Sequence, residues 1–185
     1  IQKQDFSICD ILSWMNEEVS LAEDWARFCG VPHYVIPMAQ GPASLYKLIR
    51  HQHLPSFYVS YSMTHSDKQM RREINRTIDE LNHYGLVIDP QAIEIGNNYE
   101  SEKERQAAHA YTIHRDLHWF VGKVDAIVAI HPYSECPPLS TGMMDELGHA
   151  RDYLKKRYMI FPHSKKSPFT SGSYIDKGRL LDSAQ

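Results

Sequence analysis

The chain of 185 residues is long enough for one substantial hydrophobic core, and its composition, 42% hydrophobic and 23% charged, is that of an ordinary soluble domain. The formal net charge is -3 and no long run of Lys or Arg occurs, so the sequence lacks the electrostatic signature of a protein that binds nucleic acid or a membrane surface. We therefore expect a small-molecule ligand, with no nucleic acid and no membrane as partner.

Cysteine usage and hydropathy indicate the compartment. Cys9, Cys29 and Cys136 are odd in number and lack paired spacing, which argues against a disulfide framework and against a CxxC zinc site. No apolar run approaches the roughly 20 residues that a membrane span requires. We expect a cytoplasmic protein. The sequence begins at Ile1 in the middle of a pattern, as part of a longer protein would.

The amino-terminal part of the chain carries two helical patterns. Apolar residues recur at helical spacing from Ile8 to Trp25, and Cys29-Gly30 ends that run. A short apolar stretch follows over residues 33–37, and a second helix is expected over residues 43–48.

Strands and helices alternate in the middle of the chain. The sequence predicts a buried strand over residues 57–61 and a capping box over residues 66–69 that opens a helix. Gly85 supplies the end of this helix, and residues 86–88 form a short strand.

The same alternation continues toward the carboxyl end. A long helix is expected over residues 100–122, a strand over 125–130, a helix over 141–156 and a last strand over 158–161. The tail from His163 onward is expected to be loop with one short helix.

These elements predict an α/β fold, Rossmann-like (flavodoxin-like), with a mostly parallel sheet covered by helices on both faces. We divide the chain into two parts. Residues 1–54 are an N-terminal helical or α/β segment that resembles the end of a preceding domain, and residues 55–185 are the main domain.

Hydroxyl-rich turns follow the strands over residues 57–61 and 125–130. In open α/β sheets ligands bind beyond the carboxyl ends of the strands. Both turns open helices, whose free backbone N–H groups and positive dipole end favour an anion such as phosphate. Neither GxxxxGK[ST] nor GxGxxG after a strand occurs, so nucleoside triphosphate chemistry is not supported.

Glu146 has two interpretations. Carboxylates are favoured in a first helical turn, as Asp145 and Glu146 are placed, and Ser140 and Thr141 suit helix capping. Alternatively, Glu146 lies at the ligand-binding edge of the sheet and points toward a bound sugar.

Asp116 also has two interpretations. With Ile113 three residues before it and Phe120 four after it, the carboxylate lies on the apolar stripe of its helix. A buried charge needs partners, so Asp116 either forms a structural ion pair, with Arg115 or His118 as candidates, or serves a site.

Two pairs of residues that include histidine have the spacing of metal ligands, but each pair supplies only half of a metal site. His114 and His118 stand at i and i+4, and Glu146 with His149 forms an ExxH pair. HExxH, a second ExxH and a cysteine cluster do not occur, so we predict no metal and no cofactor. The absence of GxSxG argues against a Ser-His-Asp enzyme.

Four segments together resemble the nucleoside 2-deoxyribosyltransferase superfamily, in particular its branch of 2'-deoxynucleoside 5'-monophosphate N-glycosidases. They are FYVSYS (57–62), RDLHWF (115–120), DAIVAI (125–130) and PPLSTGMMDELGHA (137–150), and the match covers residues 56–162. The resemblance implies hydrolysis or transfer of the N-glycosidic bond of a (deoxy)nucleoside 5'-monophosphate, and a homo-oligomer. The spacing from Asp116 to Asp125 is one residue longer than expected for the family.

The resemblance also implies catalytic roles. Glu146, in ELGHA, matches the glutamate that attacks the anomeric carbon, and Asp116, in DLHW, matches the carboxylate that assists at the sugar or the leaving base. Tyr58 matches a tyrosine near the sugar. Cleavage through an oxocarbenium-like state needs such a pair of carboxylates.

Substrate-binding roles follow in the same way. Ser62 matches a serine that helps bind the substrate. Ser140 stands six residues before Glu146, where the transferase branch has an aspartate that would repel a phosphate and the monophosphate branch has serine. With Thr141 and Gly142 it would receive a 5'-phosphate at the helix entrance.

Two other functions stay open at the level of sequence. The first is a non-catalytic nucleotide-binding module that regulates a larger protein. The second is a hydrolase of another nucleotide glycoside, such as an NAD-like dinucleotide.

Overall fold

A five-stranded sheet forms the centre of the fold, in the order β2-β1-β3-β4-β5. The structure is a computed structural model that describes residues 6–40, 42–63, 66–93, 99–131, 139–161, 168, 174–175 and 179–181. The strands are β1 (Ser56–Ser60), β2 (Leu86–Ile88), β3 (Ala126–Ile130), β4 (Lys156–Ile160) and β5 (Leu180–Leu181). Each neighbouring pair is parallel. Because 2-1-3-4-5 is the strand order of flavodoxin-like folds, the predicted fold class is confirmed.

The helices lie in the predicted places, with differences at their ends. They are α1 (Ile8–Cys29), α2 (Pro42–Arg50), α3 (Lys68–Tyr84), α4 (Glu102–His114), α5 (Thr141–Asp152), the 3-10 turns η1 (Met38–Gln40) and η2 (Pro90–Ile93), and the π-helix η3 (Arg115–Val121). The helix that was predicted to reach residue 156 ends at Asp152, and β4 begins at Lys156. β5 lies where the sequence predicted loop. Most of the tail, residues 132–138, Thr64 and His65 lie outside the described residues.

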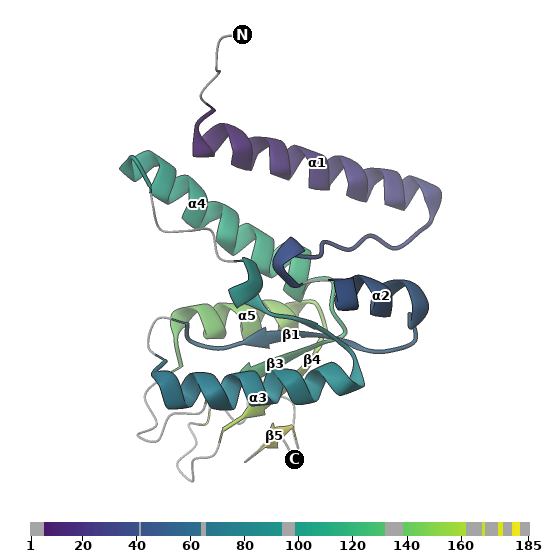
Figure 1. Cartoon of the computed structure of the whole chain (residues 1–185), viewed down its shortest axis with the longest axis vertical. Coiled ribbons are helices and arrows are strands. Elements are labelled where there is room, and N and C mark those ends of the chain that lie inside the picture. Colours follow the sequence, from purple (N-terminus) through teal and green to yellow (C-terminus); the bar gives the residue numbers. More distant parts are fainter. Residues whose placement is uncertain are drawn as a thin grey trace.

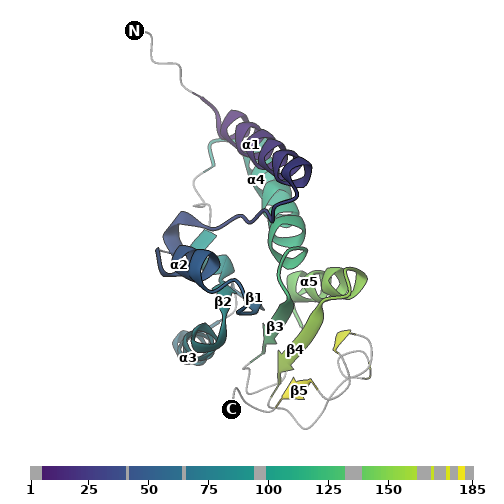
Figure 2. The same ribbon diagram turned by 90° about the vertical axis from the view of Figure 1, so that its right-hand side faces the viewer.

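Helices cover both faces of the sheet, as Figures 1 and 2 show for α3 on one side of the strands and α5 on the other. The strand β1 alternates between these faces. Val59 packs with the α3 residues Ile74 and Ile78, whereas Tyr58 packs with residues of η3 and α5. Since successive side chains of a strand point to opposite faces, the even-numbered residues of β1 face α5 and η3.

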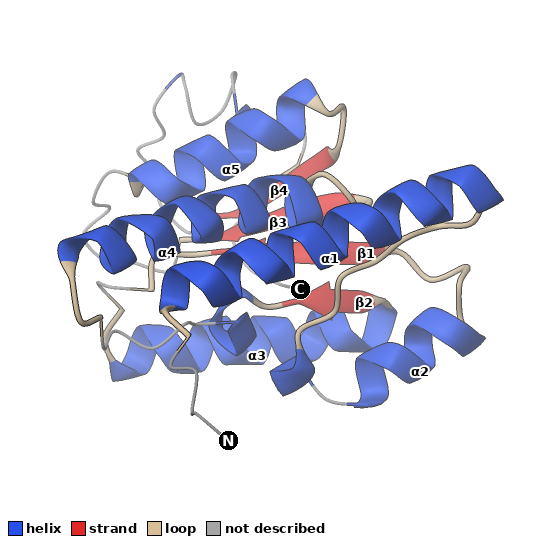
Figure 3. Cartoon of the chain, turned by 90° about the horizontal axis from the view of Figure 1, so that it is seen from above, coloured by secondary structure: helices blue, strands red, loops and turns tan. Residues whose placement is uncertain are grey.

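The long helix α1 lies beside α4 (Figure 3), and Figures 1 and 2 show that it lies away from the strands. Ser7 and Asp10 form a reciprocal capping box at its start, and Gly30 ends it with φ 67°, a left-handed conformation that favours glycine. Leu12 is its buried side chain and packs against α4 and η3. A row of large apolar side chains on α1 remains exposed, namely Trp14, Leu21, Trp25 and Phe28.

The start of α3 differs from the predicted capping box. The cap is Asp67 rather than Ser66, and its carboxylate accepts hydrogen bonds of 2.8 Å from the backbone N–H groups of Gln69 and Met70. Ser66 instead donates its hydroxyl hydrogen bond to the Ser62 carbonyl. A carboxylate at this position satisfies two free N–H groups and interacts favourably with the helix dipole, which explains the shift by one residue.

Gly85 ends α3 for a steric reason. Its φ is -169°, an extended conformation that any residue adopts, but an added Cβ would lie 2.1 Å from the Pro55 carbonyl oxygen. The Gly85 carbonyl in turn accepts a 2.9 Å hydrogen bond from the ammonium group of Lys47 on α2. The close approach of residue 85 to residue 55 brings β1 and β2 together at their starts.

The segment that was predicted as the end of one continuous helix is a π-helix. The Gly122 N–H donates a 2.8 Å hydrogen bond to the Leu117 carbonyl, five residues earlier. Ile113, which the sequence placed on the buried stripe, is 60% exposed, whereas Phe120 and Val121 are buried. A π-type turn holds one residue more than an α-type turn, which gives a physical account of the additional residue between Asp116 and Asp125.

Candidate active site

The side chain of Glu146 extends from α5 to the strand β1. Ser140 caps α5, accepting a 3.3 Å hydrogen bond from the Met143 N–H, and the helix then runs back along the sheet. The Tyr58 hydroxyl donates a 2.8 Å hydrogen bond to Glu146 Oε1, and the Ser60 hydroxyl donates a short one to Oε2. Each carboxylate oxygen is therefore held by one hydroxyl group of β1.

Burial raises the pKa of Glu146 to about 7, above its ordinary value of 4.5. The hydroxyl groups of Ser60 and Tyr58 oppose this shift, and the negative charge of Asp116 adds to it. No ion pair to Glu146 occurs within the described residues, so hydroxyl groups rather than a cation stabilise its negative charge. The carboxylate is thus ionised only in part at neutral pH, as a group tuned for chemistry often is.

Asp116 lies in the buried part of η3, at 8% exposure. Arg115, which is also buried, donates a 2.8 Å hydrogen bond from Nε to Asp116 Oδ1. Burial raises the pKa of Asp116, and the Arg115 guanidinium opposes that shift. Of the two partners considered from the sequence, Arg115 is confirmed as the one that pairs with this carboxylate.

Tyr58 connects the two carboxylates electrostatically. Burial raises the pKa of its hydroxyl well above the usual range, and the charges of Glu146 and Asp116 raise it further. The ring of Tyr58 stacks on Phe120 of η3, with centroids 6.4 Å apart. The structure therefore brings together the three residues that the sequence proposed as catalytic.

The proposed binding residues lie in the connections that follow β1 and β3. These connections are neighbours because the two strands pair directly. Ser62 follows β1 and is 6% exposed, and its hydroxyl has no hydrogen-bond partner among the described residues. Ser140 is partly buried at the start of α5, while Thr141 and Gly142 are exposed in its first turn. A buried hydroxyl without a protein partner is suited to contact a ligand.

Ser60 is a site residue that sequence reasoning missed. It is 0% exposed and its side chain binds Glu146. The signal was present in FYVSYS, where Tyr58, Ser60 and Ser62 alternate with apolar residues in a strand that is buried on both faces.

The histidines that were considered as metal ligands cluster beside η3. The ring centroids of His114 and His118 lie 4.7 Å apart, and those of His118 and His149 lie 4.9 Å apart. Among the described residues, no group of three or more His, Cys, Asp or Glu side chains could hold a metal ion. The ring of His149 donates a hydrogen bond to the Leu117 carbonyl of η3.

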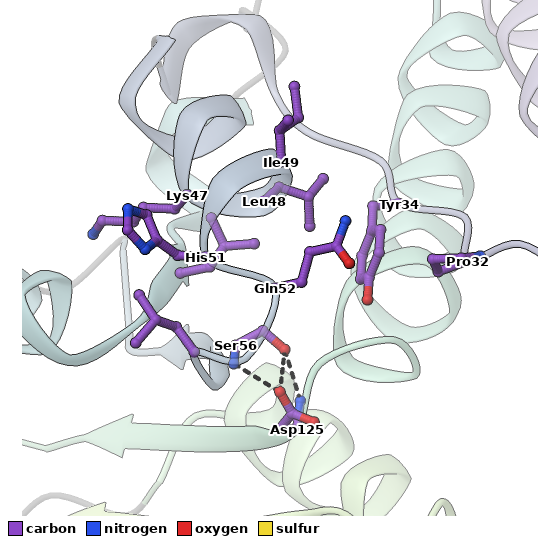
Figure 4. A pocket seen from close by; sticks show the side chains of 11 residues that line it. Pro32, Tyr34, Lys47, Leu48, Ile49, His51, Gln52, Ser56 and Asp125 are labelled. Carbon is purple, nitrogen blue, oxygen red and sulfur yellow. Dashed lines mark hydrogen bonds between the residues drawn. The ribbon is translucent and has the colours of Figure 1, made fainter.

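A cavity of about 410 Å³ lies at the opposite edge of the sheet (Figure 4). Three of its polar side chains, those of Ser56, Asp125 and Lys47, form hydrogen bonds within the protein. Asp125 accepts two 2.8 Å hydrogen bonds from the backbone N–H and hydroxyl of Ser56, and Lys47 binds carbonyl groups at the end of α3. This cavity meets the amino ends of the strands, whereas Glu146, Ser62 and Ser140 lie toward their carboxyl ends.

Comparisons with known proteins describe what the chain is similar to. No protein-family model and no curated protein matches the sequence. One similar solved structure is a 2-deoxyribosyltransferase from the psychrotolerant bacterium Bacillus psychrosaccharolyticus, with 16% identity and a TM-score of 0.47 over 65% of this chain and 82% of that chain. Another is a 2-deoxyribosyltransferase from Leishmania mexicana, with 16% identity and a TM-score of 0.41 over 69% and 77% of the two chains. At these values the likeness assigns neither family nor activity to this chain.

None of the helices in the described part of the chain is both long enough and apolar enough to span a membrane.

Proposed function

We propose that this chain hydrolyses or transfers the N-glycosidic bond of a (deoxy)nucleoside 5'-monophosphate, with Glu146 as the nucleophile. The observation that carries the proposal is the Glu146 carboxylate, which two hydroxyl groups of β1 hold in a partly buried position, with no cation beside it among the described residues. An ion pair would lower the reactivity of a carboxylate, whereas burial with hydroxyl donors leaves it basic and oriented.

The reaction proceeds in two steps. An oxygen of Glu146 attacks the anomeric carbon, a C–O bond forms, and the C–N bond to the base breaks with its electron pair moving to the base nitrogen. The departing base takes up a proton. Water or a second base then attacks the anomeric carbon and releases the Glu146 carboxylate.

Asp116 assists this reaction at the sugar or at the leaving base, and Tyr58 lies beside both carboxylates. The ion pair with Arg115 fixes the orientation of Asp116.

The phosphate site is proposed at Ser140, Thr141 and Gly142, where the first N–H groups of α5 are directed outward. Ser62, with its buried and unpaired hydroxyl, contributes a further contact to the substrate. Four further points stay predictions from the sequence: the amino-terminal segment 1–54, the main domain 55–185, a cytoplasmic location and a homo-oligomer. Light scattering on the purified chain measures the last of these.

The competing function is a non-catalytic module that senses nucleotides. A partly buried carboxylate without a cation destabilises a fold and gives nothing to a module that only binds, which favours catalysis. Incubation with a panel of deoxynucleoside and ribonucleoside monophosphates, followed by chromatography of free base, tests the proposal. Release of base supports it. A rise in melting temperature with nucleotide but no base from any member of the panel would establish the sensor.

A further inference from the structure

Ser60 is a buried serine on β1. It lies at the carboxyl end of the strand, fully buried and paired in register with Ala129 of β3. On this face of the sheet, Met143 and Leu147 of α5 lie in the same buried apolar cluster as Tyr58, two residues before Ser60. A hydroxyl group in such a place destabilises the fold unless it finds a partner.

The partner of Ser60 is the second oxygen of the carboxylate that Tyr58 binds. The Ser60 hydroxyl donates to Glu146 Oε2 and the Tyr58 hydroxyl to Oε1. The two donors stand at i and i+2 on one strand, so both point to the same face. A carboxylate bound at both oxygens cannot turn about its terminal bond without breaking a hydrogen bond.

We propose that Ser60 is a positioning residue, which holds Glu146 ionised and in the orientation for attack. This inference rests on the proposed function. Hydrogen bonds from hydroxyl groups favour the charged form of a carboxylate, and the bonds from Ser60 and Tyr58 both lower the pKa of Glu146 against the effect of burial. Without Ser60, Tyr58 alone would hold one oxygen, and the other would be a buried acceptor without a partner.

Ser60→Ala and Ser60→Cys test the proposal as a graded pair. Alanine removes the donor, and cysteine keeps the size and supplies a weak donor. The control is Thr77→Val, which removes an equally buried hydroxyl on the other face of the sheet, where it bonds the Glu73 carbonyl at 2.9 Å. Thermal melting establishes that each variant folds.

Two measurements are made on each variant. One is the titration of the Glu146 carboxyl by ¹³C NMR, with its signal identified by its loss in Glu146→Gln. The other is the pH profile of kcat/KM for base release. We expect the titration midpoint and the acid limb of the profile to move upward together, more for alanine than for cysteine, and not at all for Thr77→Val. On the acid side kcat/KM falls about tenfold for each unit of that shift.

An unmoved titration in Ser60→Ala, or an equal shift in Thr77→Val, would overturn the positioning role. If the native chain releases no base, the proposed function fails, and the NMR titration by itself still decides whether Ser60 controls the ionisation of Glu146. The two failures are therefore distinguishable. If Ser60→Ala does not fold, the cysteine variant decides the outcome.

Discussion

The hydroxyl group of Tyr58 donates a 2.8 Å hydrogen bond to Glu146 Oε1 and thereby joins the central part of β1 to α5. Tyr58→Phe removes this donor and leaves the ring on Phe120. Because a hydrogen bond to a charged group contributes about 1.5–3 kcal/mol, we expect kcat/KM for base release to fall roughly ten- to a hundredfold. Steady-state kinetics above pH 8, where Glu146 is ionised, measure this loss. A phenylalanine variant with native kinetics there would remove the tyrosine from the site.

Glu146→Gln separates chemistry from binding. Glutamine keeps the shape, and its amide oxygen can still accept from one hydroxyl group of β1, but it cannot act as a carboxylate nucleophile. We expect base release to fall by a factor on the order of 10⁴ or more. Nucleotide affinity by calorimetry should stay within a few-fold of the native value. Turnover near the native rate would show that another group attacks the sugar.

The ionisation of Glu146 predicts a pH dependence of activity. Its folded-state pKa of about 7 lies above the ordinary 4.5, and the nucleophile must be ionised. kcat/KM should therefore rise with pH and level off above about 7. A profile that is flat from pH 5 to pH 8 would contradict the assigned role.

Stability should change with pH in the opposite sense. A carboxyl group whose pKa is raised by folding stabilises the native state below its unfolded pKa, and this contribution is lost as pH rises through the folded value. The free energy of unfolding of the native chain should thus decline between about pH 4.5 and 7 relative to Glu146→Gln. Urea denaturation of both proteins across this interval provides the comparison, and parallel curves would count against the shift.

Ser140 allows a matched test of the phosphate site. Asp and Asn both serve as helix caps, so Ser140→Asp and Ser140→Asn preserve the bond to the Met143 N–H while differing in charge. An added negative charge should weaken a monophosphate roughly tenfold or more relative to the free nucleoside. The asparagine variant should keep the native preference. Equal preferences in the two variants would place the phosphate elsewhere.

Gly85→Ala tests the contact at the start of the sheet. The new Cβ would meet the Pro55 carbonyl oxygen at 2.1 Å, and such overpacking of backbone costs about 1–3 kcal/mol. Gly148→Ala is the control, because nothing lies within 4 Å of its Cβ and alanine suits a helix better by up to about 1 kcal/mol. Chemical denaturation should show opposite signs for the two substitutions. The same sign for both would contradict the packing at residue 85.

The fold could be predicted from the sequence to a large extent because burial leaves a periodic trace. Apolar runs located β1 to β4, and Gly30 and Gly85 ended their helices as expected. The strand β5 has two residues, too few to show a period. The turn in η3 escaped prediction because the sequence placed both Asp116 and Ile113 on one buried stripe, whereas Asp116 is buried and Ile113 is exposed.

The sequence proposed residues for the candidate site, but not the contacts between them. The family resemblance proposed Tyr58, Asp116 and Glu146, and the structure brings all three together. The pairing of Ser60 with Glu146 joins positions 86 residues apart, and a single sequence carries no information on which distant side chain shares a face with which.

The wide turn of η3 sets the direction of the Asp116 carboxylate. Asp116 precedes the bond from Gly122 to Leu117, while Phe120 and Val121, which anchor the segment in the core, fall within its span. Wound as an α-helix, the same residues would place Phe120 and Val121 at a different angle from Asp116 around the helix axis. With these two side chains anchored in the core, the Asp116 carboxylate would then turn away from Tyr58.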